Sequence, residues 1–292
     1  MNKAKLTGNT LIIGTTTCYA LVPSLSFLAF DVGVETETLL FDKFFYATIL
    51  MWAYILIQRL PFRMDKKTGQ MMLIIGLAYI GIATTLYYAF DYISGSLATI
   101  ISFTFPAMII AIEMLIGRER KSMTKIFAVI ISMIGMVVIV WSPDLSANII
   151  GILFALGTAI CYVIYTMGLS AERIKNTNAI VVAGYVLIMS ALFNFFRCYA
   201  SGKPLFTKGL EQLWLILILA LVCTFMAILF FCMGVKRTGP SNAAIINTFE
   251  PVLACFFGYT IIGDVLTRNM IIGSVLVVTA VLIANLPTKT NH

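Results

Sequence analysis

Long apolar runs, separated by short polar loops, recur along the entire chain. Each run is close to the roughly 20 residues that an α-helix needs to cross a bilayer. Within the runs the apolar positions are continuous, which argues against the alternating strands of a membrane β-barrel. The pattern predicts an all-α integral membrane protein with ten transmembrane helices, at residues 9–30, 38–58, 70–90, 94–117, 123–141, 149–170, 178–199, 211–235, 240–262 and 268–286.

The composition excludes a soluble globular protein. Of the 292 residues, 60% are hydrophobic and 11% are charged, whereas a soluble domain is about 45–50% apolar and about 25% charged. A soluble fold of this composition would have nowhere to bury its apolar surface. Ten spans also leave no room for a separate soluble domain such as an ATPase.

The charged residues predict an orientation in the membrane. The formal net charge of +7 would suit a nucleic-acid-binding protein only if the basic residues shared one face of a fold. With the N-terminus inside, 15 of the 20 Lys and Arg residues lie at cytoplasmic loops and four lie at outer loops. Cytoplasmic loops are enriched in Lys and Arg. We therefore expect a multi-pass protein of the cell (inner) membrane, with both termini cytoplasmic and no nucleic-acid partner.

The second half of the chain repeats the first at an offset of about 145 residues. Aligning Pro106 with Pro251 sets the stretch SGSLATIISFTFP beside GPSNAAIINTFEP. GTTTCYA at 14–20 likewise resembles GTAICYV at 157–163.

This repeat predicts two five-helix halves, residues 1–145 and 146–292. Because five is odd, the two halves must enter the membrane in opposite orientations. Inverted repeats are typical of secondary transporters, whose substrate site lies near the bilayer midplane where the halves meet. The repeat therefore predicts a transporter that works by alternating access and is driven by a gradient.

Each proline stretch is followed by a glycine and an acidic residue, in GRE around Glu119 and in GD ending at Asp264. Over essentially the whole chain, this pattern resembles the EamA family of the drug/metabolite transporter superfamily. The resemblance implies a helical bundle with a central cavity that moves small metabolites by alternating access. Many members of the family export amino acids or related compounds, and others move sugars, nucleotides or organic cations.

We therefore expect a secondary active transporter that exports an amino acid or a related amine. Uptake of a quaternary amine or a similar organic cation is the alternative within the same fold. A membrane receptor or a channel is the alternative from another class.

Glu250 lies near the middle of the predicted span at 240–262. A charged side chain there costs at least a few kcal/mol unless it faces a cavity or a partner. Asn247 precedes it by about one turn on the same helix face. These residues predict a substrate site in which Glu250 binds a cationic group or a proton, and exchange of the two would couple transport to a proton gradient. The alternative is local, because polar groups here would also compensate for a kink at Pro251.

Other candidate residues follow from the helix-breaking prolines and from aromatic side chains at mid-span. Pro106 and Pro251 each free a carbonyl four residues back, so both predict a kink that faces the cavity or only shapes packing. A mid-span tyrosine needs a partner for its hydroxyl, either in a cavity or on a neighbouring helix. The candidate substrate-binding aromatics are Tyr19, Tyr162, Tyr165, Tyr88 and Phe105, the last at the repeat position of Glu250.

No signature of catalysis, of a metal site or of a cofactor site is visible in the sequence. The single histidine, His292, lies outside the predicted spans, and the six cysteines fall in apolar runs without a CxxC pair. No phosphate-binding loop is present. We expect a protein that is not an enzyme and that carries no cofactor or metal. The expected partners are a small-molecule substrate and the lipid bilayer, and the expected state is a monomer or a homodimer.

Overall fold

The computed structural model describes residues 3–90, 92–93, 95–118, 123–140, 148–263 and 266–285. Glu119 and Asp264, from the ends of the two repeated stretches, lie outside these residues. Every regular element in the described part of the chain is a helix, as the continuous apolar runs predict.

The helices follow one another with short connections. Those of the first half are α1 (Lys3–Ala20), α2 (Val22–Asp31), α3 (Thr36–Ile57), α4 (Lys66–Phe90), α5 (Gly95–Ser102), α6 (Phe105–Leu115) and α7 (Met123–Val140). Those of the second half are α8 (Ile149–Leu169), α9 (Glu172–Lys175), α10 (Ala179–Ala200), α11 (Leu210–Ile218), the π-helical η1 (Leu219–Met226), α12 (Ala227–Thr238), α13 (Pro240–Asn247), α14 (Glu250–Phe257), the π-helical η2 (Gly258–Ile262) and α15 (Arg268–Asn285).

Seven helical stretches within the described residues are long and apolar enough to cross a membrane. Three further apolar helices are shorter, at Phe105–Leu115, Met123–Ile139 and Arg268–Ile283. Helices suit a bilayer because each one satisfies its backbone hydrogen bonds within its own segment.

Three predicted spans are divided rather than continuous. The stretch at 9–30 forms α1 and α2, which meet at Leu21. The stretches at 94–117 and 240–262 form α5 with α6 and α13 with α14. In each case a proline occupies the first turn of the second helix. Its missing N–H and its ring disrupt the hydrogen bond to the carbonyl four residues earlier, so the helix ends and begins again.

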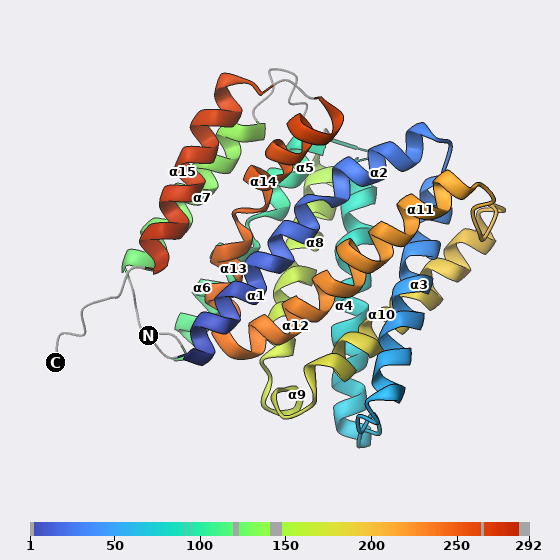
Figure 1. The fold of residues 1–292 in the computed structure, drawn as a ribbon. Helices are drawn as coiled ribbons and strands as arrows, with labels where there is room; N and C mark the ends of the chain where they lie inside the picture. Colours follow the sequence, from blue (N-terminus) through green and yellow to red (C-terminus); the bar gives the residue numbers. More distant parts are fainter. Residues whose placement is uncertain are drawn as a thin grey trace.

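Helices of the two halves pair with each other across the bundle. The pair α1 and α12 and the pair α4 and α8 pack closely in the interior, while α3 with α10 and α7 with α15 form the two edges (Figure 1). Each pair takes one helix from either half. Exchanging the halves would convert the pair of α1 and α12 into the pair of α8 and α4.

Two matched threonines support these interior pairs. The Thr15 hydroxyl on α1 donates to the Ala227 carbonyl on α12 at 3.2 Å. The Thr158 hydroxyl on α8 lies 2.8 Å from the Thr85 hydroxyl on α4. Thr15 and Thr158 occupy the same place in the repeated GT motif, so equivalent residues connect equivalent helix pairs.

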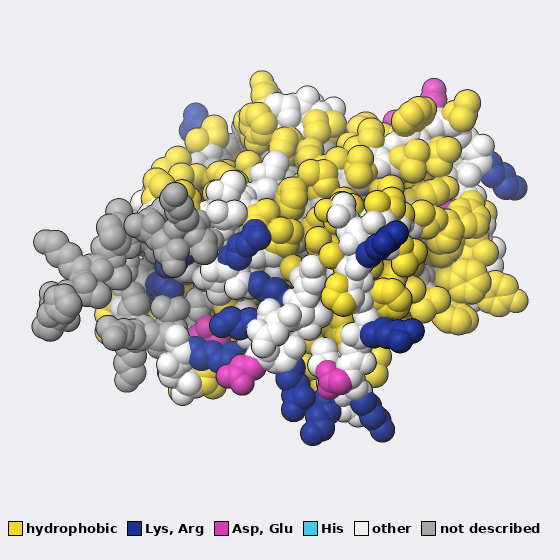
Figure 2. Space-filling view, turned by 60° about the horizontal axis from the view of Figure 1, so that its bottom comes forward, with side chains coloured by type: hydrophobic (Ala, Val, Ile, Leu, Met, Phe, Trp, Pro, Cys, Tyr) yellow, Lys and Arg dark blue, Asp and Glu magenta, His cyan; other side chains and the backbone are white. Residues whose placement is uncertain are grey.

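Basic side chains gather at the end of the bundle where α9 lies (Figures 1 and 2). Lys236, near the end of α12, donates hydrogen bonds to the carbonyl oxygens of Ile174, at 2.6 Å, and of Thr177. These bonds fix the end of α12 to the loop around α9. The connection from α3 to α4, with four basic residues at 59–67, lies at the same end (Figure 1).

Two glycines let the backbones of α7 and α15 approach each other closely. A Cβ atom at Gly135 would lie 2.8 Å from the carbonyl oxygen of Gly273 and 2.9 Å from the Cβ of Leu276. A Cβ atom at Gly273 would lie 2.8 Å from the backbone nitrogen of Ile139. Small residues at such contacts are the usual means by which membrane helices pack.

Gly135→Ala is expected to lower the free energy of unfolding by about 1–3 kcal/mol, the usual cost of overpacking. The added methyl group would press on the backbone of α15. Thermal unfolding in detergent measures the effect. Gly69→Ala is the control, because nothing lies within 4 Å of a Cβ at Gly69 and alanine favours the helix. Matching unfolding midpoints for the two variants would contradict the close contact.

Candidate functional site

The helix breaks of the two halves face each other, because α13 packs against α6. Pro106 and Pro251 stand in the first turns of α6 and α14. Each lies four residues after the last residue of the preceding helix, Ser102 in α5 and Asn247 in α13. Irregular backbone at membrane depth is tolerated only where protein or cavity water surrounds it.

Hydroxyl side chains accompany both breaks. At the first, Ser102 donates to the Ala98 carbonyl at 2.7 Å and Thr104 donates to the Ile101 carbonyl at 2.7 Å. At the second, Thr248 donates to the Ile245 carbonyl at 2.6 Å. These hydroxyls supply donors to backbone carbonyl oxygens where the regular helical pattern ends.

Asn247 ends α13 and is fully buried. Its Oδ1 accepts a hydrogen bond of 2.9 Å from the Thr16 hydroxyl of α1, which is also fully buried. Its Nδ2, with two N–H donors, has no hydrogen-bond partner in the described part of the chain. Because Oδ1 is bonded and Nδ2 is not, the Nδ2 group can donate a hydrogen bond to a ligand that enters the break.

Glu250 is the first residue of α14, directly after the break. An acidic side chain in the first turn interacts favourably with the helix dipole. The side chain is partly exposed, and it interacts electrostatically with Tyr162 of α8. Within the described residues, no Lys or Arg forms an ion pair with Glu250.

Tyr162 connects the two breaks. Its ring stacks on that of Phe105, with centroids 4.4 Å apart and planes 13° apart. Phe105 opens α6 and is 2% exposed. Phe105 and Glu250 occupy equivalent positions in the repeat. Phe105 stacks on Tyr162, and Glu250 interacts with it electrostatically.

Three further tyrosines extend this cluster across the bundle. Tyr19 of α1 is within hydrogen-bonding reach of Tyr79 of α4 and interacts electrostatically with Tyr162. Tyr165 of α8 is 1% exposed, and its ring stacks on Phe231 of α12 at 5.4 Å. The rings of Tyr79 and Tyr165 lie 5.1 Å apart. Helices α1, α4, α8 and α12 thus all place aromatic side chains at one site.

Of the aromatic residues predicted from the sequence, Tyr88 lies apart from this cluster in the contacts described. It is 51% exposed, and its ring packs against Phe154, 5.4 Å away. Conversely, Tyr79 belongs to the cluster although the sequence analysis did not select it. The rule that a mid-span tyrosine needs a partner also applies to Tyr79. Its repeat counterpart is Thr224, so the repeat gave no second signal.

These features define a helical membrane protein whose interior holds a carboxylate, an amide and a group of tyrosines beside broken helices. The chain belongs to the EamA-like transporter family, whose model matches residues 6–141 and again residues 149–286. It is thus a multi-pass membrane transporter of the drug/metabolite transporter superfamily, built on two repeats.

Several curated proteins are similar along most of the chain. The "Uncharacterized transporter YcbK" of Bacillus subtilis (strain 168) is 25% identical over 282 residues, covering 90% of this chain and 87% of that protein. The "Uncharacterized transporter YoaV" of the same organism is 23% identical, covering 88% of this chain and 90% of that protein. The "Solute carrier family 35 member B1 homolog" of Drosophila melanogaster is 21% identical, covering 86% and 80%.

A solved crystal structure shares the fold. It has a TM-score of 0.79 and 18% sequence identity, and the match covers 97% of both chains. At this identity the likeness concerns the fold alone.

Thr16→Val is expected to lower the free energy of unfolding by about 1–3 kcal/mol, because it leaves the buried Asn247 amide without its partner. Thr17→Val is the control, since among the described residues the Thr17 hydroxyl bonds within α1, to the Ile13 carbonyl at 2.9 Å. Thermal unfolding of both variants in detergent makes the comparison. Equal stability of the two would show that the bond between α1 and α13 contributes nothing.

Proposed function

We propose that this transporter is secondary active and moves a small metabolite with an ammonium group, an amino acid or a related amine, by alternating access. The half-buried carboxylate of Glu250, without a basic partner in the described chain and beside Tyr162, carries this proposal. An unpaired acid at membrane depth is costly unless a cation or a proton neutralises it.

The surroundings of Glu250 suit an ammonium attached to an apolar body. Tyrosine faces attract cations through the ring quadrupole. Tyr162 interacts with the carboxylate, and three further tyrosines from α1, α4 and α8 belong to the same cluster as Tyr162. The Asn247 amide at the same break can donate to a polar group of the ligand. Phe105 and Phe231 supply apolar surface on either side of the tyrosines.

The arrangement of helices supports ten spans in two inverted halves, residues 1–145 and 146–292. Inverted halves exchange roles during alternating access, so helix pairs should be equivalent under that exchange. The pairs α1 with α12 and α8 with α4 meet this requirement, and so do the matched threonines within them.

For orientation, we propose that the basic end of the bundle faces the cytoplasm, following the enrichment of Lys and Arg in cytoplasmic loops. Helix α1 begins and α15 ends at this end (Figure 1), which suits cytoplasmic termini. The membrane is then the cell (inner) membrane. Transport is outward, with a proton replacing the exported cation at Glu250 on the return step.

Glu250→Gln is expected to weaken binding of the amine ligand about thirtyfold, because losing one member of a desolvated charge pair costs about 2 kcal/mol or more. The purified protein in detergent is screened by thermal shift against amino acids, amines, nucleosides and sugars. A ligand at a hundredfold excess over its Kd stabilises the folded state by about 2.7 kcal/mol. Only ammonium compounds should stabilise the wild type, and Glu250→Gln should lose the response.

Glu172→Gln is the matched control, because Glu172 is exposed on the short helix α9. It should keep the wild-type response. Stabilisation by sugars or nucleosides and not by ammonium compounds would refute the amine proposal. A response to quaternary amines alone would favour the uptake alternative, and ion conductance in a bilayer would favour a channel.

Proton coupling predicts that an imposed pH gradient drives transport in proteoliposomes. A tritiated ligand identified by the thermal shift screen should accumulate when the gradient is applied to the wild type. Glu250→Gln should show no dependence on the gradient, since glutamine cannot carry the proton. A wild type that exchanges ligand at a rate independent of the gradient would refute the coupling while leaving the cation site in place.

A further inference from the structure

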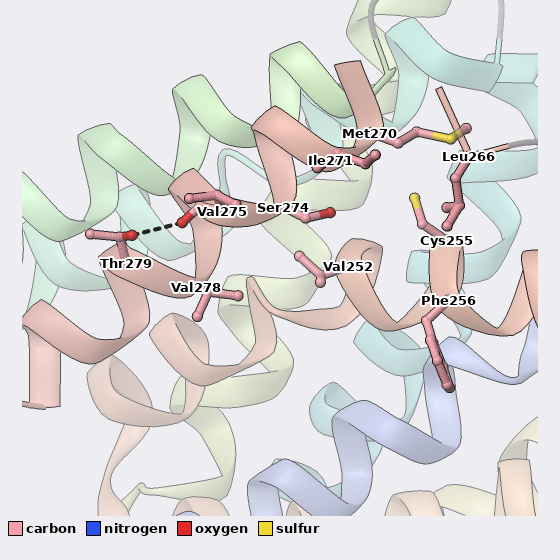
Figure 3. A pocket seen from close by; sticks show the side chains of 10 residues that line it. All are labelled: Val252, Cys255, Phe256, Leu266, Met270, Ile271, Ser274, Val275, Val278 and Thr279. Carbon is pink, nitrogen blue, oxygen red and sulfur yellow. Dashed lines mark hydrogen bonds between the residues drawn. The ribbon is translucent and has the colours of Figure 1, made fainter. Parts of the chain in front are cut away.

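A groove runs between α14 and α15 (Figure 3). Its volume is about 380 Å³. Val252 and Cys255 of α14 and Ser274 and Val278 of α15 form its partly buried floor. Val252 follows Glu250 by two residues, about 200° around the helix. The groove and the carboxylate therefore occupy opposite faces of the same helix.

The groove lies at the depth of the bilayer core. All of its lining residues except Leu266 belong to the span Pro240–Ile262 or to the apolar helix Arg268–Ile283. Side chains on its rim, such as Phe256 and Val275, are 55% and 59% exposed. In a membrane-spanning chain such apolar surface meets hydrocarbon, so the medium that fills the groove is lipid.

The groove has the length of one lipid leaflet. On α15 it extends from Met270 to Thr279, which is about 14 Å along a helix axis. The hydrocarbon core of a bilayer is about 30 Å thick, so one leaflet is about half of that. A single acyl chain, entering from the end of α15 that carries Met270, would match the length of the groove.

Packing around the broken helix gives such a chain a structural role. Seven of the eight residues of α13 are buried, whereas α14, after the break, has no buried residue. Protein therefore surrounds the first half of this span and leaves the second half open on the groove side. An acyl chain there would supply the missing contacts behind α14.

The mouth of the groove has a charge that suits a phospholipid headgroup. Arg268 opens α15 and is exposed; in the sequence it stands between Leu266 and Met270, which both line the groove. A guanidinium group binds phosphate oxygens in a bidentate manner.

We propose that the groove between α14 and α15 binds one acyl chain of an anionic phospholipid, with the phosphate at Arg268 and the chain packed against α14. The site is distinct from the substrate site and does not depend on which metabolite is transported.

Photolabelling of the unmodified protein tests this site. The protein is placed in vesicles of phosphatidylethanolamine and phosphatidylglycerol that contain a small fraction of phosphatidylglycerol with a diazirine midway along one acyl chain. After irradiation, peptide mass spectrometry maps the adducts, and each yield is divided by the exposed area of the residue. Groove residues are expected to exceed other exposed apolar residues several-fold, because a bound chain stays between two walls. Yields that simply follow exposed area would overturn the proposal.

A groove-filling variant provides the second test. Ser274→Phe places a ring on the floor and should reduce the adducts on Val252 and Val278 several-fold. Ile272→Phe is the matched control, since Ile272 is 56% exposed on α15 outside the groove, and should leave them unchanged. Unchanged groove adducts in Ser274→Phe would overturn the site.

Arg268→Gln tests the headgroup. In the wild type, the phosphatidylglycerol probe should label the groove more than the same chain on phosphatidylcholine, and Arg268→Gln should remove that preference. Equal labelling by the two probes in the wild type would overturn the assignment of the phosphate to Arg268. The acyl-chain site itself would then rest on the adduct map alone.

Discussion

The structure depends on one constraint, which is that hydrocarbon offers no hydrogen-bond partner to a peptide group. The spans divided at Pro106 and Pro251 contain backbone groups that no regular helix satisfies. Such groups must lie where protein or trapped water can reach them, so the two divided spans occupy the interior and α13 packs against α6. The polar side chains that accompany the breaks are thereby placed inside the bundle, away from lipid.

The two halves are alike in their helices but not in their chemistry. The pairing of α1 with α12 and of α8 with α4 follows the repeat, and so does the hydrogen bonding of Thr15 and Thr158. At the breaks, the first half contributes Phe105 and the second contributes Glu250. Of these two equivalent positions at the breaks, only one therefore holds a carboxylate, and Tyr162 stacks on Phe105 and interacts electrostatically with Glu250.

Features that depend on local chemistry were predictable from the sequence. Hydropathy identified the apolar helices, and the prolines marked the divisions of α5 from α6 and of α13 from α14, because a missing N–H acts wherever it occurs. The division at Leu21 follows the same rule through Pro23, yet the apolar run around it concealed the break. No feature recognised in the sequence predicted the π-helical turns of η1 within the span at 211–235.

The assembly of the site was less predictable, because hydropathy does not say which face of a helix turns inward when every face is apolar. Tyr19 and Tyr162 were found through the repeat, whereas Tyr79 had no repeated partner to mark it. Tyr88 has the same residue type but packs against Phe154 at the exposed side of α4. Both tyrosines contact α8, but only Tyr79 also lies within hydrogen-bonding reach of Tyr19 on α1.

The contrast between the buried α13 and the open α14 has a mechanical consequence. A helix enclosed along one half and open on one side along the other can turn toward the open side about the joint between them, here residues 248 and 249. Glu250 lies almost at that pivot, so it would move little, while the far end of α14 is about 12 Å away. A rotation of 10° about the joint would displace that end by about 2 Å. A small movement of a ligand held at the carboxylate would thus accompany a larger movement of the protein surface at the far end of α14.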